Sequence, residues 1–225
     1  MRFKNQLAAM DAELFNSAIS GNEINFDSNP KQLTAGGNSI LHVAAKSGNA
    51  HTMTRVFARQ PDLLYMTNSK GNTALHITAS LGHSDMTEQL ITFAKRQEVE
   101  MKMELLRTQN LEQNTALHEA IRYDHYTIVE LLIQEDPGLT LITNNAGESP
   151  LFLAVDRRFY KIALHIIDTP GDHLPSYKGR KSKNVLHASV INRAKTGNYF
   201  ELYLLKFSIP FLFFRQVLLN FAKEG

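Results

Sequence analysis

Nine histidines are the residues of this chain whose chemistry first suggests a metal or catalytic site. Zinc needs its nitrogen ligands at about 2 Å, so candidate histidines must converge on one point. HEAIR, which begins at His118, contains the first half of the HExxH zinc motif, but Arg122 stands where the second histidine is required. This segment therefore does not predict a metalloprotease.

Four of the histidines occupy equivalent places in similar short motifs, with a phenylalanine in the fifth such place. Consecutive positions are separated by 34, 42, 34 and 35 residues and are His42, His76, His118, Phe152 and His187. If each motif sits on its own helix, neighbouring positions lie about 10 Å apart, the distance between packed helices. That spacing is too wide for these histidines to share one metal ion.

The other common catalytic signatures are missing from the sequence. The chain has no cysteine, which excludes a thiolate nucleophile, a disulfide and a cysteine-based zinc site. The loops GGNS from Gly36 and GNTA from Gly71 lack the GxxxxGK[ST] spacing of a phosphate-binding loop, and no GxSxG serine motif occurs. We therefore expect no enzyme, no cofactor and no metal.

Composition indicates a packed protein with weak electrostatics. The 225 residues allow one to two domains, and 43% of them are hydrophobic and 20% charged, as in ordinary globular proteins. The formal net charge is only +2, which gives no reason to expect nucleic-acid binding.

An internal repeat with a period of about 34 residues organises the chain. Similar segments begin at Gly37 (GNSILHVAAKSGN), Gly71 (GNTALHITASLGH), Gln113 (QNTALHEAIRYDH) and Gly147 (GESPLFLAVDRRF), with a weaker copy at Lys183 (KNVLHAS). The spacer PxLxxxTN occurs twice, and LFNSAISGN near the front resembles a shortened copy. Eight extra residues in the second copy fall in residues 94–107, a run of good helix formers that predicts an extended second helix.

The G-x-[ST]-x-L-H-x-A pattern is similar to the ankyrin repeat. The resemblance implies an all-α ankyrin-repeat solenoid, in which helix-turn-helix units stack in one elongated domain. The expected units are a capping repeat at 10–33, repeats at 34–67, 68–109 (with the insertion), 110–143 and 144–177, a degenerate repeat at 178–206, and an apolar aromatic tail at 207–225. MDAELFNSAISGN and NVLHASV also resemble a plant family of accelerated-cell-death type, whose C-terminal membrane domain this chain lacks.

Each repeat carries the residues that a turn followed by a helix requires. Glycines 37, 71 and 147 suit a turn with positive φ, and a Ser or Thr two positions later can cap the first helix. Gly48 and Gly82 are expected to end first helices, whereas Asp124 and Arg158 replace glycine at a cost of up to about 1 kcal/mol each. We expect the repeated histidines to bond the turn hydroxyl and a neighbouring backbone.

Recognition is the remaining chemistry, and the resemblance places it on the concave surface of turn tips and first helices. Leu81, Leu111 and Tyr123 are apolar or aromatic at positions expected to be exposed, and arginine and tyrosine are common at binding hot spots. The partner-binding candidates are Lys46, Ser69, Lys70, Leu81, Leu111, Glu112, Arg122, Tyr123, Asn145, Asp156 and Arg157.

The C-terminal end leaves alternatives open. Residues 199–221 include 16 large apolar side chains, but Glu201, Lys206, Pro210 and Arg215 interrupt them, so a buried or partner-covered segment is favoured over a spanning helix. The segment docks on a membrane or is a last helix with an extension. The basic loop KGRKSK from Lys178 is a solvated loop, a nuclear import signal or a contact for anionic lipid.

The sequence thus predicts a non-enzymatic scaffold for protein–protein interaction that binds a protein partner and no nucleic acid. The resemblance implies a role in plant stress or defence signalling. The alternative is a signalling component docked on a membrane through the apolar tail. The expected location is cytoplasmic, with peripheral membrane association under the alternative.

Overall fold

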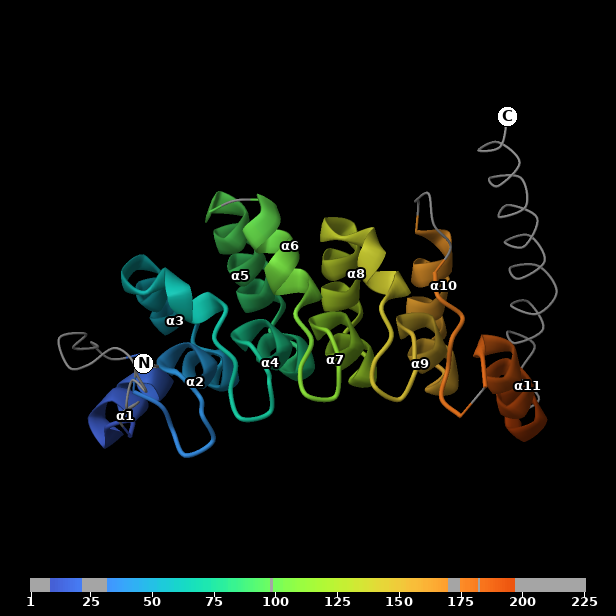
Figure 1. Ribbon diagram of the computed structural model, residues 1–225, viewed down its shortest axis with the longest axis horizontal. Coiled ribbons are helices and arrows are strands. Elements are labelled where there is room, and N and C mark those ends of the chain that lie inside the picture. The colour runs from blue at the N-terminus through green and yellow to red at the C-terminus, as the bar shows by residue number, and fades with distance from the viewer. Residues whose placement is uncertain (1–8, 22–31, 98, 170–174, 182, 197–225) are drawn as a thin grey trace, which may run out of the picture. The chain divides into compact units, whose positions relative to one another are not determined.

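The computed structural model describes residues 9–21, 32–97, 99–169, 175–181 and 183–196. In these ranges the chain forms an all-α repeat fold of eleven α-helices and two short 3₁₀ helices, with no β-strand longer than an isolated bridge (Figure 1). The residues group into two compact units, unit 1 (residues 1–111) and unit 2 (residues 112–225), and each is described by itself. The all-α fold expected from the sequence is confirmed.

Unit 1 contains two helix pairs preceded by a single helix. The single helix is α1 (Ala12–Ser20), and the pairs are α2 (Ile40–Ser47) with α3 (Ala50–Arg59) and α4 (Ala74–Leu81) with α5 (Ser84–Gln97). The 3₁₀ helix η1 (Pro61–Leu64) follows α3. First helices pack on first helices, α1 on α2 and α2 on α4, while α3 packs on α5 (Figure 1).

The eight-residue insertion forms a separate helix instead of lengthening the second one. The sequence predicted one extended helix through residues 94–107, whereas α5 ends at Gln97 and α6 (Val99–Arg107) packs against it (Figure 1). Leu105 and Leu106 on α6 are fully buried. A straight extension of α5 would carry such leucines away from the core, so hydrophobic burial favours the folded-back arrangement.

Unit 2 repeats the same plan. Its pairs are α7 (Ala116–Arg122) with α8 (Tyr126–Glu135) and α9 (Pro150–Asp156) with α10 (Tyr160–Asp168), followed by α11 (Val185–Thr196). The 3₁₀ helix η2 (Pro137–Leu141) follows α8, so each of the two PxLxxxTN spacers begins with a short 3₁₀ helix of its own. α7 and α11 each pack on α9, and α8 packs on α10 (Figure 1).

The apolar stripe of each first helix forms the core. The leucine that opens the stripe and the alanine three or four positions later are completely buried in all four repeats: Leu41, Ala44, Leu75, Ala79, Leu117, Ala120, Leu151 and Ala154. Full burial of one leucine contributes about 1.5–3 kcal/mol. The alanines let neighbouring helices approach closely, because they add only one methyl group each.

The turns and caps also form as the sequence predicts. Gly37, Gly71 and Gly147 precede the first helices with φ of 71°, 74° and 76°. At the opposite ends of α7 and α9, Asp124 and Arg158 adopt φ of 61° and 65°, a left-handed conformation that glycine would adopt more easily.

Each repeated histidine closes the first turn of its own helix. His42 Nδ1 accepts hydrogen bonds from the Ser39 backbone N–H (3.2 Å) and hydroxyl (2.7 Å), so its proton lies on Nε2, which donates to the Asn72 carbonyl at 2.8 Å. His118 makes the equivalent bonds to Thr115 and to the Glu148 carbonyl at 3.3 Å. Burial lowers the pKa of His42, which keeps the imidazole neutral in this arrangement.

Several predicted segments lie outside the described residues. They are the apolar tail (207–225), the end of the degenerate repeat (197–206), and most of the second half of the capping repeat (22–31). In the described part of the chain, no helix combines the length and the apolarity that crossing a membrane requires.

Candidate protein-binding surface

In unit 1, the predicted binding residues lie at turn tips and on the exposed side of first helices. Lys46, Ser69 and Lys70 are exposed, Leu81 at the end of α4 is 46% exposed, and Leu111 is 72% exposed. Successive turn tips are joined by backbone hydrogen bonds, from Ser69 N–H to the Gly36 carbonyl (3.1 Å) and from Leu111 N–H to the Lys70 carbonyl (3.1 Å). These apolar tips are therefore fixed in position although they face solvent.

The same arrangement recurs in unit 2. Glu112, Tyr123, Asn145 and Arg157 are exposed, and the Asn145 N–H donates to the Glu112 carbonyl at 2.9 Å. Tyr123 follows the last residue of α7 and is 56% exposed.

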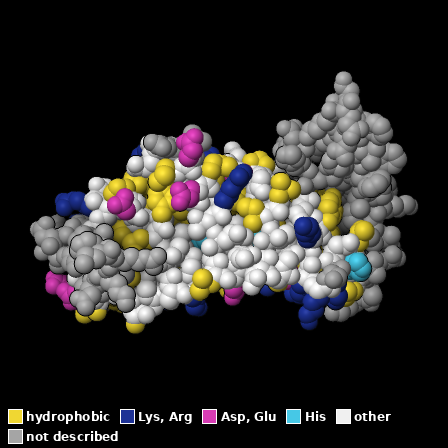
Figure 2. Space-filling view, viewed as in Figure 1, with side chains coloured by type: hydrophobic (Ala, Val, Ile, Leu, Met, Phe, Trp, Pro, Cys, Tyr) yellow, Lys and Arg dark blue, Asp and Glu magenta, His cyan; other side chains and the backbone are white. Residues whose placement is uncertain are grey.

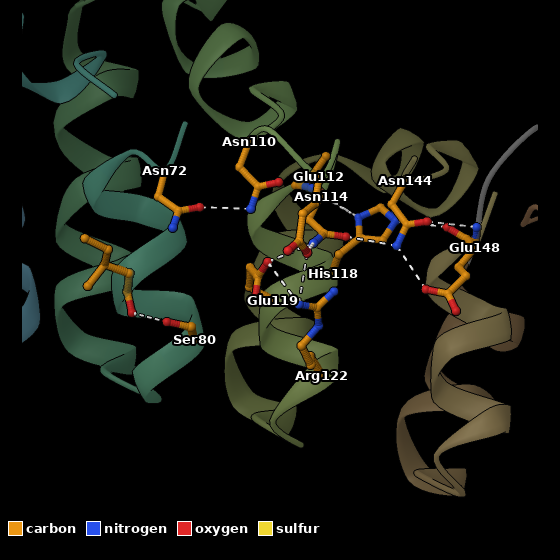
Figure 3. Close-up of polar contacts among 12 residues, drawn as sticks. Asn72, Ser80, Asn110, Glu112, Asn114, His118, Glu119, Arg122, Asn144 and Glu148 are labelled. Carbon is orange, nitrogen blue, oxygen red and sulfur yellow. Dashed lines mark hydrogen bonds and ion pairs between the residues drawn. The ribbon is translucent and has the colours of Figure 1, made fainter. Parts of the chain in front are cut away.

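A series of asparagine pairs beneath the turns was not anticipated from the sequence. The side-chain amide of one turn donates to the side-chain oxygen of the previous turn, as Asn68 does to Asn38 at 2.9 Å. Asn110 donates to Asn72 (2.9 Å) in unit 1 and Asn144 to Asn114 (3.0 Å) in unit 2 in the same way (Figure 3). These bonds hold successive turns at a fixed spacing. The signal was available, because Asn68 and Asn144 close the two PxLxxxTN spacers.

Asn144 also organises its own turn. Its side-chain oxygen accepts from the backbone N–H groups of Ala146 and Glu148, both at 3.0 Å. Asn68 does the same for Lys70 and Asn72 at 2.9 and 3.1 Å. The asparagines therefore stabilise each turn and connect it to its neighbour.

In unit 2, two buried carboxylates stand beside this asparagine pair (Figure 3). Glu119 on α7 is 8% exposed, accepts from the Asn114 amide at 3.0 Å and lies 3.9 Å from the Arg122 guanidinium. Glu148 is 6% exposed and accepts from the Asn144 amide at 3.1 Å. Buried charges need partners, and both glutamates have them.

Three arginines complete the polar network of unit 2. Arg122 pairs with Glu112 at 3.3 Å as well as with Glu119. Arg180 bridges Glu148 (3.0 Å) and Asp156 (2.9 Å). Arg157 instead donates from one guanidinium nitrogen to the Arg122 carbonyl at 3.3 Å, which places its side chain against the peptide bond that leads to Tyr123.

Comparison with known proteins identifies the repeat. The family model for ankyrin repeats matches residues 6–103, 42–142 and 99–174, which together span more than half of the chain. The chain belongs to the ankyrin-repeat family. Ankyrin repeats indicate protein partners, and members of this family are generally non-enzymatic interaction scaffolds.

Stretches of two larger proteins are similar to this chain. Protein ACCELERATED CELL DEATH 6 of Arabidopsis thaliana is 28% identical over 148 residues, which are 61% of this chain and 22% of that protein. Transient receptor potential cation channel subfamily A member 1 of Drosophila melanogaster is 26% identical over 172 residues, 73% of this chain and 13% of the channel. The chain thus spans less than a quarter of either relative's length.

The binding candidates differ in how far their side chains are exposed to a partner. Arg122 and Asp156 are partly buried and engaged in ion pairs, with side chains 26% and 30% exposed. Tyr123 and Arg157 remain exposed next to each other. Of the arginine and tyrosine anchors named from the sequence, these two are therefore the ones that a partner can reach.

An apolar groove of about 530 Å³ lies in unit 1, and its lining includes Phe15, Ile19 and Val43 together with Lys46. Phe15 and Ile19 are 38% and 45% exposed. Lys46 was among the residues predicted from the sequence, but Phe15 and Ile19 were not, because the shortened copy was interpreted as a cap. Within the described ranges, no group of three His, Asp or Glu side chains is arranged to hold a metal ion.

Proposed function

We propose that this ankyrin-repeat chain is a non-enzymatic scaffold that binds a protein partner on its turn tips and first helices. In unit 2 the centre of that surface is the pair Tyr123 and Arg157, with Arg122 beneath them. In unit 2, Glu112, Asn145 and Asp156 add contact area. In unit 1, the candidates are Lys46, Ser69, Lys70, Leu81 and Leu111.

One observation supports this proposal most strongly. Tyr123 is exposed, and Arg157 is held beside it by the hydrogen bond to the Arg122 carbonyl. Interfaces concentrate their binding energy in a few residues, and tyrosine and arginine are enriched among them. Side chains that are held in place before binding lose less conformational entropy when a partner arrives.

The similarity to the Arabidopsis protein extends the proposal to a biological setting. That relative's name refers to accelerated cell death. We place the scaffold in plant stress or defence signalling on the strength of this similarity.

The test is a comparison of captured partners. The full chain and the double variant Tyr123→Ala with Arg157→Ala are immobilised, and proteins retained from a plant cell extract are quantified by mass spectrometry. The matched control is Glu130→Ala with Gln134→Ala, two exposed residues of α8 on the second-helix side. Circular dichroism melting verifies that all three proteins are folded equally.

The proposal expects the Tyr123/Arg157 variant to lose specific partners that the α8 variant retains. If the two variants and the unaltered chain retain the same proteins in the same amounts, this surface does not bind the partner.

A further inference from the structure

The chemistry of the partner can be inferred from how the charges of unit 2 are distributed. Four of its carboxylates on the α7 and α9 side are already engaged in ion pairs within the protein. Glu112 and Glu119 pair with Arg122, while Glu148 and Asp156 pair with Arg180. These four carboxylates therefore have internal cationic partners.

Arg157 takes no part in these ion pairs. Asp156, its neighbour in sequence, bonds to Arg180 instead. In the part of the chain that the structure describes, no carboxylate lies within ion-pair distance of Arg157, and its guanidinium donates to the Arg122 carbonyl. A guanidinium carries five N–H donors, so four remain for a ligand.

The basic loop predicted from the sequence contacts α9 at two points and adds to the positive charge. The Ser149 N–H at the start of α9 donates to the Lys178 carbonyl at 2.9 Å, and the Arg180 side chain reaches Asp156 at the other end of the helix. Arg180 therefore links the loop that carries Lys178, Lys181 and Lys183 to the residue that precedes Arg157. In Figure 2, dark-blue Lys and Arg side chains gather at the lower edge of this part of unit 2.

We name the exposed side chains Arg157, Arg158, Lys178, Lys181 and Lys183 the basic strip. Among the described residues, none of the five has an ion-pair partner. Such an excess of one charge attracts a ligand of the opposite charge and speeds its association. The strip begins at Arg157, whose guanidinium bonds to the carbonyl of Arg122, the residue before exposed Tyr123.

We propose that unit 2 binds an acidic segment of its protein partner, with a carboxylate on Arg157 and an adjacent apolar side chain on Tyr123. This inference rests on the proposed function and adds the chemical class of the partner. A carboxylate matches the planar fork of a guanidinium and accepts two parallel hydrogen bonds from it. Further acidic residues of the segment would face Arg158 and Lys181.

The geometry favours a peptide over an anionic membrane as the ligand. A bilayer surface attracts clustered basic side chains without requiring them to hold any particular orientation. Here the bond to the Arg122 carbonyl holds one guanidinium at the peptide bond that leads to the exposed Tyr123. That arrangement suits a side-chain carboxylate followed by an apolar residue.

The test begins with selection of random dodecamer peptides displayed on phage against the full chain. Enriched peptides are synthesised with a fluorophore, and their affinity for each variant is measured by fluorescence anisotropy. Arg157→Gln removes the charge but keeps a polar side chain of similar reach. Lys161→Gln is the matched control, because it removes a positive charge from α10, where the Lys161 ammonium lies 3.5 Å from the centre of the Tyr126 ring.

We expect enriched peptides to carry acidic residues next to an apolar one, and to bind Arg157→Gln about tenfold more weakly, the loss of one charge-assisted hydrogen bond. Lys161→Gln is expected to bind unchanged, and added salt to weaken binding to the unaltered chain. Arg157→Glu, tested with peptides whose acidic residues are replaced by lysine, should recover binding if the contact is direct.

Other outcomes separate the inference from the proposed function. The inference is overturned if the enriched peptides lack acidic residues. It is also overturned if they bind Arg157→Gln as tightly as the unaltered chain but bind Tyr123→Ala more weakly. Either result leaves the proposed interaction surface standing. Peptides insensitive to both variants would overturn both. Binding to phosphatidylserine vesicles that Arg157→Gln abolishes, without any acidic peptide, would replace the peptide with a membrane.

Discussion

Gly179 is predicted to be indispensable because it lies directly on the ring of Phe152. A Cβ built at position 179 would overlap three ring carbons of Phe152, which is only 1% exposed and cannot move aside. Phe152 occupies the place where other repeats carry histidine, so this contact is specific to the junction of α9 with the basic loop. Overpacking of this kind costs about 1–3 kcal/mol.

We expect Gly179→Ala to lower the free energy of unfolding by about 1–3 kcal/mol, measured by urea denaturation with circular dichroism. At this chain length each kcal/mol corresponds to about 2–4 °C in Tm. Gly36→Ala is the matched control, since a Cβ there meets mainly the Asn38 side-chain nitrogen, 3.1 Å away, and this nitrogen can shift.

A double-mutant cycle identifies the cause. Phe152→Leu removes the ring edge, so Gly179→Ala should cost clearly less in that background than in the unaltered chain. If Gly179→Ala leaves stability unchanged, or if its cost is the same with and without the Phe152 ring, the packing argument is refuted.

Two further predictions concern the repeat itself. Burial lowers the pKa of His42, so the unfolded chain takes up a proton more readily than the folded chain. The free energy of unfolding should therefore fall as the pH drops below about 6.5. For one such group the slope is at most about 1.4 kcal/mol per pH unit. His42→Gln should reduce this slope in urea titrations at several pH values while exposed His51→Gln should not, and equal slopes would contradict the assignment. Asp124→Gly should raise the free energy of unfolding by up to about 1 kcal/mol, because glycine adopts the φ of 61° without strain. Asp124→Val should lower it, because valine is β-branched. A loss of stability with glycine would show that the backbone there is not strained.

Local rules made most of the fold predictable from sequence. The turn glycines, the Ser and Thr caps, Pro150 at the start of α9 and the buried leucines each follow from chemistry within a few residues. The separate helix α6 was not predictable in this way. Propensity favours helix through residues 94–107 but does not say where the chain turns back, which depends on where Leu105 and Leu106 find a core.

The sequence predicted where the candidate surface residues lie in each repeat, but not which of them are engaged in ion pairs within the protein. Repeat position located Tyr123, Arg122 and Arg157 on one face, and the structure describes them there. Arg122 forms an ion pair with Glu119, which is only three positions away in the sequence. The ion pairs of Arg180 with Glu148 and Asp156 instead span 32 and 24 residues. No periodic pattern marks Arg180, because the fifth copy departs from the repeat at that point.

Site-specific photo-crosslinking tests the central claim most directly. A photoreactive phenylalanine analogue is placed at Tyr123 in one protein and at Gln134 on the opposite, second-helix side in another, and both are irradiated in cell extract. We predict discrete crosslinked partners from position 123 that are missing from position 134 and whose crosslinked peptides carry acidic residues. Crosslinks from position 134 alone would contradict the account.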